Sequence, residues 1–159
     1  MEMTATHWTW IVIATVWGAF FSWYTSFGGP LTDEEIEHYL SVADTMEPTP
    51  DPEQIAQLRR FMEEDTGDDF VMINIGEQYD VPLQIEGVEP GQSTDEVLSN
   101  YLAYVWPALF SRASHPVLVG MASSTAIELI NTEGMEVWDD STSMRYRSRR
   151  DFMDFVTDP

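Results

Sequence analysis

Four of the chain's seven arginines lie close together near its carboxyl end, in the stretch MRYRSRR. They are Arg145, Arg147, Arg149 and Arg150. If residues 144–147 form a strand, Arg145 and Arg147 share one face, because side chains alternate along a strand. Guanidinium groups match the geometry of carboxylates and phosphates, so this group could bind an anion or a partner protein. In a chain with 28 acidic residues, the arginines could instead pair with carboxylates of the same chain, such as Glu77, Asp80 or Asp139.

Two polar residues in expected strands are the candidates for catalysis. His115 begins the apolar run HPVLVGMAS, and Asn74 lies within the earlier run FVMINI. Both runs are rich in β-branched residues and indicate buried strands. A small pocket could form around these two residues, together with Tyr101, Tyr104 and Arg145. The alternative for His115 is a structural role at the end of a helix or strand.

The sequence predicts no metal site and no cofactor. His7, His38 and His115 lack the spacing of metal ligands, and the chain has no cysteine for a disulfide, a thiolate nucleophile or an iron–sulfur centre. The acidic residues between Glu63 and Asp69 lack the offsets of a calcium loop and are expected to be solvated. Nucleophile-elbow, phosphate-loop and dinucleotide motifs are also missing from the sequence.

The net charge of -21, with no lysine, excludes nucleic acid as a main partner, because neutralising phosphates requires clustered cations. The acidity is compatible with a saline habitat, a basic partner or a need for solubility. These three explanations stay open.

Residues 8–27 form an uncharged run that is long enough, at about 1.5 Å per residue, to cross the roughly 30 Å hydrocarbon core of a bilayer. Trp8 and Trp10 at one end, and Trp23 and Tyr24 at the other, are residue types that favour the membrane interface. The leader MEMTATH has no basic residue, which argues against a cleaved signal peptide. We therefore expect residues 1–30 to be a tail and a transmembrane anchor in the cell membrane.

Two further features bear on this expected anchor. Ala14, Gly18 and Ser22 recur at every fourth position and would let a second membrane helix approach closely. The positive-inside rule counts lysine and arginine residues near a membrane span. The nearest one here is Arg59, so the rule predicts no orientation. The acids that follow the segment weakly favour a domain outside the cytoplasm.

The remaining chain is expected to contain an amphipathic helix and a proline-rich linker at 31–52 and one α+β domain at 53–159. Thr32 with Glu35, and Asp51 with Gln54, predict capping boxes at two helix starts. Ser93 or Thr94 should cap a long helix that reaches about Ala113. A third strand is expected at about 136–147, interrupted near 139–141. Ser148 with Asp151 should cap the last helix.

The order strand, long helix, strand, strand, short helix is a split βαβ arrangement. The runs LRRFMEEDTGDDFVMINI, SHPVLVG and WDDSTSMRYRSRRDFMDFVTDP resemble the DUF1330-like branch of the dimeric α/β-barrel superfamily, over residues 55–159. The resemblance implies a ferredoxin-like domain, which in this superfamily pairs sheet to sheet with a second copy. Some relatives are cofactor-independent monooxygenases or isomerases, and others are haem proteins. The usual closing strand of the family is missing from this sequence, and a transmembrane helix is not typical of it.

These observations lead to three functional hypotheses. The first is a single-pass membrane-anchored accessory or assembly subunit of a larger membrane protein complex, with other transmembrane subunits or a second copy as partners. The second is a small monooxygenase- or isomerase-like enzyme acting on an apolar substrate. The third is a homodimeric scaffold.

Overall fold

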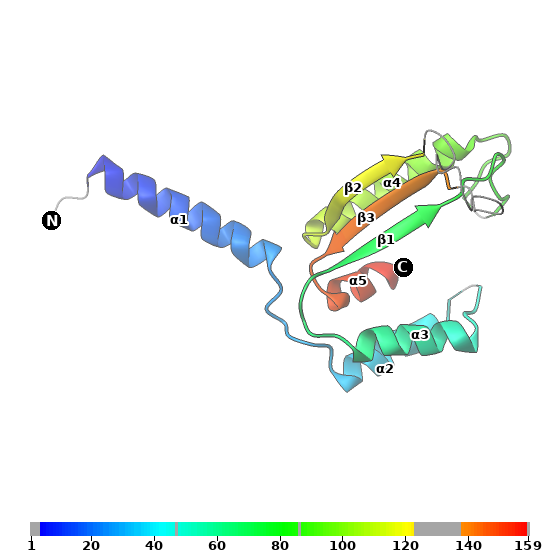
Figure 1. Cartoon of the computed structure of the whole chain (residues 1–159), viewed down its shortest axis with the longest axis horizontal. Coiled ribbons are helices and arrows are strands. Elements are labelled where there is room, and N and C mark those ends of the chain that lie inside the picture. Colours follow the sequence, from blue (N-terminus) through cyan, green and yellow to red (C-terminus); the bar gives the residue numbers. More distant parts are fainter. Residues whose placement is uncertain (1–3, 47, 86, 123–137, 159) are drawn as a thin grey trace, which may run out of the picture. The chain divides into compact units, whose positions relative to one another are not determined.

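The computed structural model describes residues 4–46, 48–85, 87–122 and 138–158 of an α+β chain. Its contacts divide the chain into two compact units, residues 1–70 with 146–159 and residues 71–145. The first unit is helical and holds α1 (Ala5–Tyr24), α2 (Asp33–Ala43), α3 (Pro52–Glu63) and α5 (Arg149–Val156). The second unit holds α4 (Thr94–Ser111) and most of the strands β1 (Phe70–Gly76), β2 (His115–Met121) and β3 (Asp140–Tyr146). These elements are labelled in Figure 1.

The helix starts follow the predicted capping residues. The Thr32 hydroxyl accepts a hydrogen bond from the Glu35 amide at 3.3 Å, and Glu35 accepts one from the Thr32 amide at 2.8 Å. Asp51 and Gln54 form the same reciprocal pair at the start of α3. Capping boxes of this kind satisfy amide groups that have no partner within the helix. The two capping-box predictions are therefore confirmed.

The helical unit has its own hydrophobic core, built from one face of each of three helices. Met62 of α3 and Met153 of α5 are each only 1% exposed. They pack with Leu31, which precedes α2, and with Ile36, Tyr39 and Leu40 of α2. This packing stabilises α2, which is short enough to be marginal on its own.

Aromatic rings add a second set of contacts within the helical unit. Phe152 of α5 lies edge-on to Phe61, Phe70 and Tyr146, with centroid distances between 4.9 and 5.9 Å. Phe70 and Tyr146 stack nearly parallel at 5.3 Å. Phe70 is the first residue of β1 and Tyr146 is the last residue of β3. These two strand ends therefore belong to an aromatic cluster of the helical unit.

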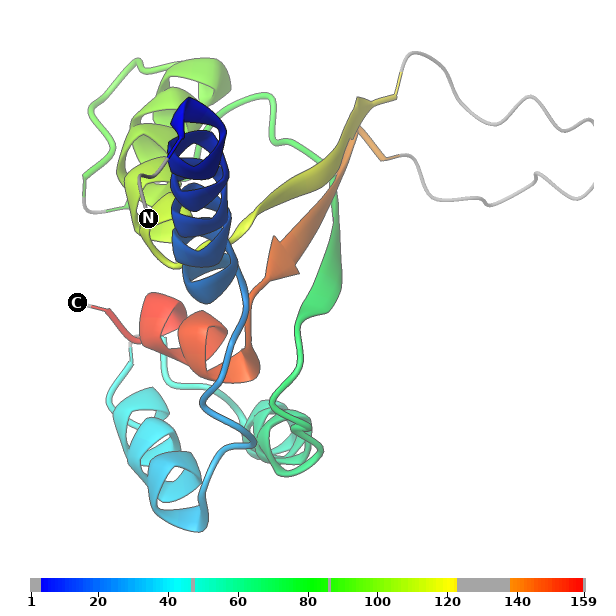
Figure 2. The ribbon, with the colours of Figure 1, turned by 90° about the vertical axis from the view of Figure 1, so that its left-hand side faces the viewer.

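The described residues of the sheet unit form three strands in the order β1-β3-β2. β3 runs antiparallel to β2, from the pair Met121↔Asp140 to the pair His115↔Arg145, with an irregularity between Pro116 and Leu118. In Figure 1, β1 and β2 point the same way and β3 points the opposite way between them. α4 connects β1 to β2 and lies on one side of the sheet (Figure 2). Pro107 lies inside α4 without ending it.

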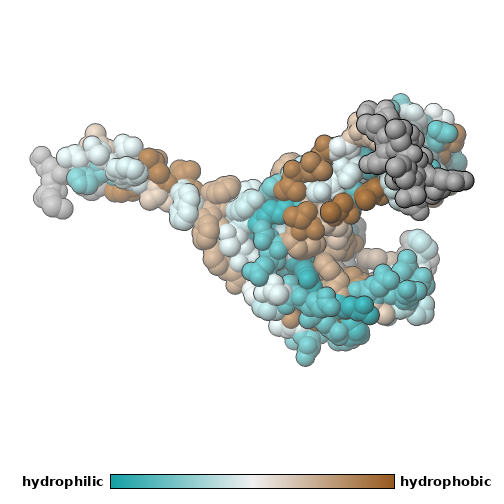
Figure 3. Space-filling model, viewed as in Figure 1, coloured by the Kyte–Doolittle hydropathy of each residue, from teal (hydrophilic) through white to brown (hydrophobic). Residues whose placement is uncertain are grey.

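The two faces of β1 differ in exposure, whereas β2 exposes apolar residues on both faces. Because the Phe70 and Tyr146 rings stack, even-numbered residues of β1 and β3 share one face and odd-numbered residues share the other. On the even face Met144 is 5% exposed and Met72 is half-buried. On the odd face the apolar residues of β1 are more than half exposed. The view in Figure 3, with α4 behind the strands, shows hydrophobic residues gathered over them.

The predicted membrane anchor is wrong. α1 covers most of the expected segment, but no helix among the described residues is long and apolar enough to cross a membrane. The segment has no charge, yet its threonine, serine and tryptophan side chains carry polar atoms that lower its hydropathy. The prediction of a single-pass membrane protein with its domain outside the cytoplasm is wrong for the same reason. Trp8, Trp10, Trp23 and Tyr24 lie on this helix, and the helix has no buried residue.

The sequence-based strand limits agree in part with the structure. β1 begins at Phe70, as expected, and α4 ends at Ser111, close to the expected end. β3 begins at Asp140, within the region where an interruption was expected. The sequence further predicts that residues 126–131 continue the strand that begins at His115 or pair with it across a turn. These residues and the expected start of the third strand at 136 lie outside the described residues.

Candidate functional site

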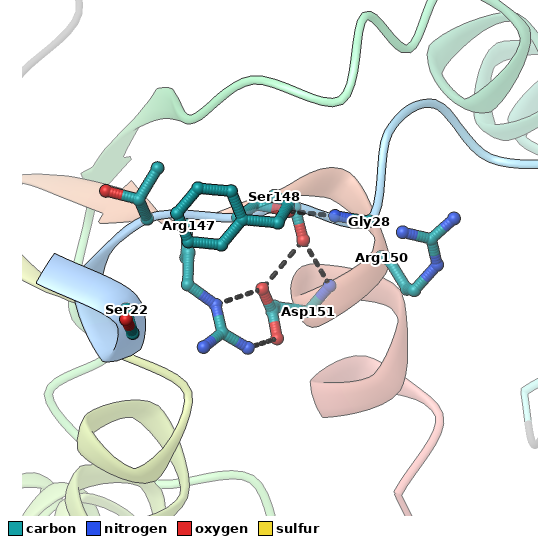
Figure 4. A pocket seen from close by; sticks show the side chains of 9 residues that line it. Ser22, Gly28, Arg147, Ser148, Arg150 and Asp151 are labelled. Atoms are coloured by element: carbon teal, nitrogen blue, oxygen red, sulfur yellow. Dashed lines mark hydrogen bonds and ion pairs between the residues drawn. The ribbon is translucent and has the colours of Figure 1, made fainter. Parts of the chain in front are cut away.

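Arg147 is held by a carboxylate of the next helix and by the end of α1. Its Nε donates to Oδ2 of Asp151 at 2.8 Å and its Nη2 donates to Oδ1 at 2.5 Å, which is a two-pronged ion pair. Its Nη1 donates to the carbonyl oxygen of Trp23 at 2.9 Å. The hydrogen bonds that Arg147 donates to Asp151 hold the pKa of Arg147 above its ordinary value. Figure 4 shows the Arg147 guanidinium and the Ser148 hydroxyl converging on Asp151.

Arg150 joins α5 to the segment before α2. Its Nε donates to Oε1 of Glu35 at 2.6 Å and its Nη2 donates to Oε2 at 3.0 Å. The same guanidinium donates to the carbonyl oxygens of Gly29 at 3.3 Å and Pro30 at 3.1 Å. Hydrogen bonds from Arg150 lower the pKa of Glu35 to about 2, with a smaller contribution from the Thr32 amide. One guanidinium therefore stabilises both the linker and the capping box of α2.

The other two arginines of the group also have partners within the chain. Arg149 lies over the ring of Phe61, 4.7 Å from its centroid, and donates to the carbonyl oxygen of the same residue. Its Nε lies 3.9 Å from Oδ1 of Asp65. Arg145, in the sheet unit, is 7% exposed and donates to the carbonyl oxygen of Ala113 at 3.0 Å. The carboxylates that pair with Arg147, Arg149 and Arg150 are thus Asp151, Asp65 and Glu35.

A shallow hollow of about 240 Å³ lies in the helical unit beside Arg147 and Arg150 (Figure 4). Serine, threonine and glycine from the end of α1 and its linker form one wall, and the start of α5 forms the other. The lining residues are Ser22, Thr25, Ser26, Phe27, Gly28, Arg147, Ser148, Arg150 and Asp151. A Cβ at Gly28 would lie 2.4 Å from Nη1 of Arg150, so a larger residue there would require the guanidinium to shift. The carboxylates balance the arginines, so the hollow has no clear excess of positive charge.

The two catalytic candidates lie on different faces of the sheet. His115 is the cross-strand partner of Arg145, so it belongs to the odd face. Asn74 has an even number in β1 and lies on the face that carries Phe70. His115 is half-buried and its Nδ1 is 3.1 Å from the carbonyl oxygen of Pro116. The structure does not bring the two candidates together.

The remaining predicted site residues are exposed on helices. Tyr101 is 57% exposed and Tyr104 is 61% exposed on α4. Ala14, Gly18 and Ser22 lie on α1, and a Cβ at Gly18 would meet nothing within 4 Å. Among the described residues, no group of three or more histidine, aspartate or glutamate side chains is arranged to hold a metal ion.

Sequence reasoning missed two buried polar contacts. Asp65, expected to be solvated, has a side chain that is only 2% exposed and accepts hydrogen bonds from the amides of Leu31 at 2.8 Å and Gly67 at 3.1 Å. The Asp-x-Gly spacing, which is typical of turns, was the available signal. The Tyr39 hydroxyl donates to Oδ1 of Asp154 at 2.6 Å. Burial and this carboxylate raise the pKa of Tyr39, and no local pattern predicts a contact between residues so far apart.

Comparison with known proteins gives a fold likeness only. No model of a protein family matches the chain, and no curated protein matches its sequence. A similar solved structure is the crystal structure of methylated RPA0582 protein, at 22% identity and a TM-score of 0.54. The match covers 69% of this chain and 75% of that one. At this identity the likeness supports an α+β fold and carries no function.

Proposed function

We propose that this chain is a non-catalytic accessory subunit of a protein complex, and that its sheet unit is a ferredoxin-like interaction domain that pairs with a second copy. The connection β1–α4–β2–β3, with β3 between the other two strands, is the first part of a split βαβ arrangement. This order supports the resemblance to the DUF1330-like branch of the dimeric α/β-barrel superfamily. Pairing of two sheets face to face is what that resemblance implies.

The observation that carries the proposal is a patch of exposed apolar residues on the odd face of the sheet. Val71, Ile73 and Ile75 of β1 are 53%, 65% and 52% exposed. Leu118 of β2 is 58% exposed and belongs to the same face, because it pairs with Ser143. A contiguous exposed apolar face of this kind is typical of an interaction site.

A second copy fits this face better than an arbitrary partner. The four apolar residues and the two serines between them, Ser141 and Ser143, carry no charge. Two copies can therefore meet there although each chain has a net charge of -21. A two-fold contact uses the same patch on both copies, so an uncharged apolar patch is complementary to itself.

The expected affinity is modest. Burying the exposed part of these side chains contributes about 1–2 kcal/mol each, or on the order of 8–16 kcal/mol for the pair. Association costs about 4–15 kcal/mol in lost freedom, so the two terms are of similar size. We therefore expect a dimer that dissociates on dilution.

Sedimentation equilibrium across a range of protein concentrations tests the proposal. The variant Leu118→Asp places a carboxylate on the odd face and should be monomeric at concentrations where the natural chain is dimeric. The matched control is Leu83→Asp, because Leu83 is 59% exposed and lies in the loop after β1. A natural chain that stays monomeric, or a dimer that Leu118→Asp leaves intact, contradicts the proposal.

The enzyme hypothesis receives less support. The small pocket suggested around His115 and Asn74 together is not supported, because the strand register assigns these residues to opposite faces. The non-catalytic function is the one that the described geometry favours.

A further inference from the structure

The free edge of β1 is a second surface of the sheet unit, separate from its odd face. In the order β1-β3-β2, β1 pairs with β3 on one side, and no described strand pairs with it on the other. An edge strand presents amide and carbonyl groups that can pair with another chain. β1 has seven residues, FVMINIG, with no charged residue and no proline. Nothing in this strand interferes with addition of a further strand.

The opposite edge of the sheet is different. β2 contains Pro116, which has no amide hydrogen to donate, and its pairing is irregular between Pro116 and Leu118. Proline and bulges are the features by which natural sheets prevent unwanted pairing at an edge. The contrast indicates that only the β1 edge is suited to receive a strand.

Acidic residues stand at both ends of this edge. Asp68 and Asp69 directly precede β1, Glu77 directly follows it, and all three are exposed. If two copies paired antiparallel through β1, with Phe70 opposite Gly76, Asp69 of each would face Glu77 of the other. Like charges directly opposite each other destabilise a strand pair. In this register the carboxylates disfavour a second copy, whereas a strand with basic ends would find a carboxylate at each end of β1.

We propose that the β1 edge binds an extended segment of a partner protein, in which an alternating β-branched run is flanked by basic residues. The main chain of that segment continues the sheet beyond β1, and its basic ends pair with Asp68 or Asp69 and with Glu77. Strand addition of this kind takes affinity from main-chain hydrogen bonds and specificity from side chains. The inference does not depend on dimerisation through the odd face.

The probe is a fluorescein-labelled peptide, RRVTVTVRR, and the readout is fluorescence anisotropy with the full chain. The natural chain and the variant Leu118→Asp should bind it alike, which separates this site from the dimer contact. A peptide N-methylated at both its valines and its threonines can donate no main-chain hydrogen bond from this run and should not bind. Hydrogen exchange should slow at amides of β1 and not at those of β2.

The acidic ends are tested by Asp68→Asn with Glu77→Gln, which should weaken binding by about three- to tenfold and reduce its salt dependence. The control pair, Asp44→Asn with Glu89→Gln, makes the same change in charge at exposed positions away from the strand and should bind as the natural chain does.

Three results would overturn the inference. One is absence of saturation up to millimolar peptide, and another is equal binding of the N-methylated peptide. The third is slowed exchange in β1 that depends on protein concentration without peptide, which would identify a second copy as the occupant. Loss of the dimer alone would contradict only the proposed function.

Discussion

Neutralising Glu35 should destabilise the chain because Arg150 would lose its carboxylate partner. The pKa of Glu35 is lowered from 4.5 to about 2. At about 1.4 kcal/mol per pKa unit, this corresponds to at most about 3 kcal/mol of stability. The Arg150 and Glu35 side chains are 24% and 33% exposed, so solvent screening reduces the contribution to about 1–2 kcal/mol. We expect Glu35→Gln to lower the free energy of unfolding at pH 7 by that amount.

The pH dependence provides a sharper test than the magnitude. A carboxylate whose pKa is lower in the folded state stabilises the fold above its ordinary pKa. That stability is lost as the pH falls from about 4.5 towards 2. About three quarters of it should be gone at about pH 2.5. The difference between the natural chain and Glu35→Gln should therefore shrink across this range.

Urea unfolding followed by circular dichroism measures this difference, since urea does not screen charges. Glutamine preserves the capping box, because its side-chain oxygen can also accept the Thr32 amide. The control is Glu96→Gln, at the corresponding position of the α4 capping box. The Ser93 amide, and not an arginine, is the main cause of the lowered pKa of Glu96. An equal loss of stability in both variants, or a Glu35→Gln deficit that persists undiminished at about pH 2.5, would refute the reasoning.

Two further predictions concern packing in the helical unit. Gly67→Ala should destabilise the fold by well over 1 kcal/mol, because Gly67 has a φ of +81° and a Cβ there would lie 2.7 Å from the Cα of Gly29. Gly87 also has a positive φ but open space around it, so Gly87→Ala should lower the unfolding temperature less than Gly67→Ala does. The difference between the two variants then measures the effect of the steric clash. Met153→Ala should reduce the free energy of unfolding by about 2–5 kcal/mol, since the side chain is 1% exposed in the core. Urea titration checks this, and a loss below 1 kcal/mol would contradict the assigned core.

Helix starts and the strand β1 could be predicted because their causes are local. Thr32 and Glu35 lie three residues apart, which is the spacing a capping box requires, whatever the rest of the chain does. The short apolar run FVMINI, rich in β-branched residues, likewise indicates a strand. Counting charges in residues 8–27 failed as a test for a membrane span, because an uncharged segment can still be too polar to cross a bilayer.

The partners of the arginines could not be predicted in the same way. Arg150 pairs with Glu35, a residue 115 positions away in the sequence, and the carboxylates suggested by the sequence were Glu77, Asp80 and Asp139. In a chain with 28 acidic residues, composition alone offers too many possible partners. Packing of α5 in the core of the helical unit selects Glu35.

By itself, the sequence determined the helix caps, the strand and helix order, the absence of thiol chemistry and the strongly acidic surface. These follow from residue types and from spacings within one or two turns. Only the tertiary structure decided that Asp65 is buried, that His115 and Asn74 lie on opposite faces, and that the odd face exposes a patch of apolar residues. The reason is that strand register and the choice among many carboxylates depend on contacts between residues far apart in the chain, which no local pattern encodes.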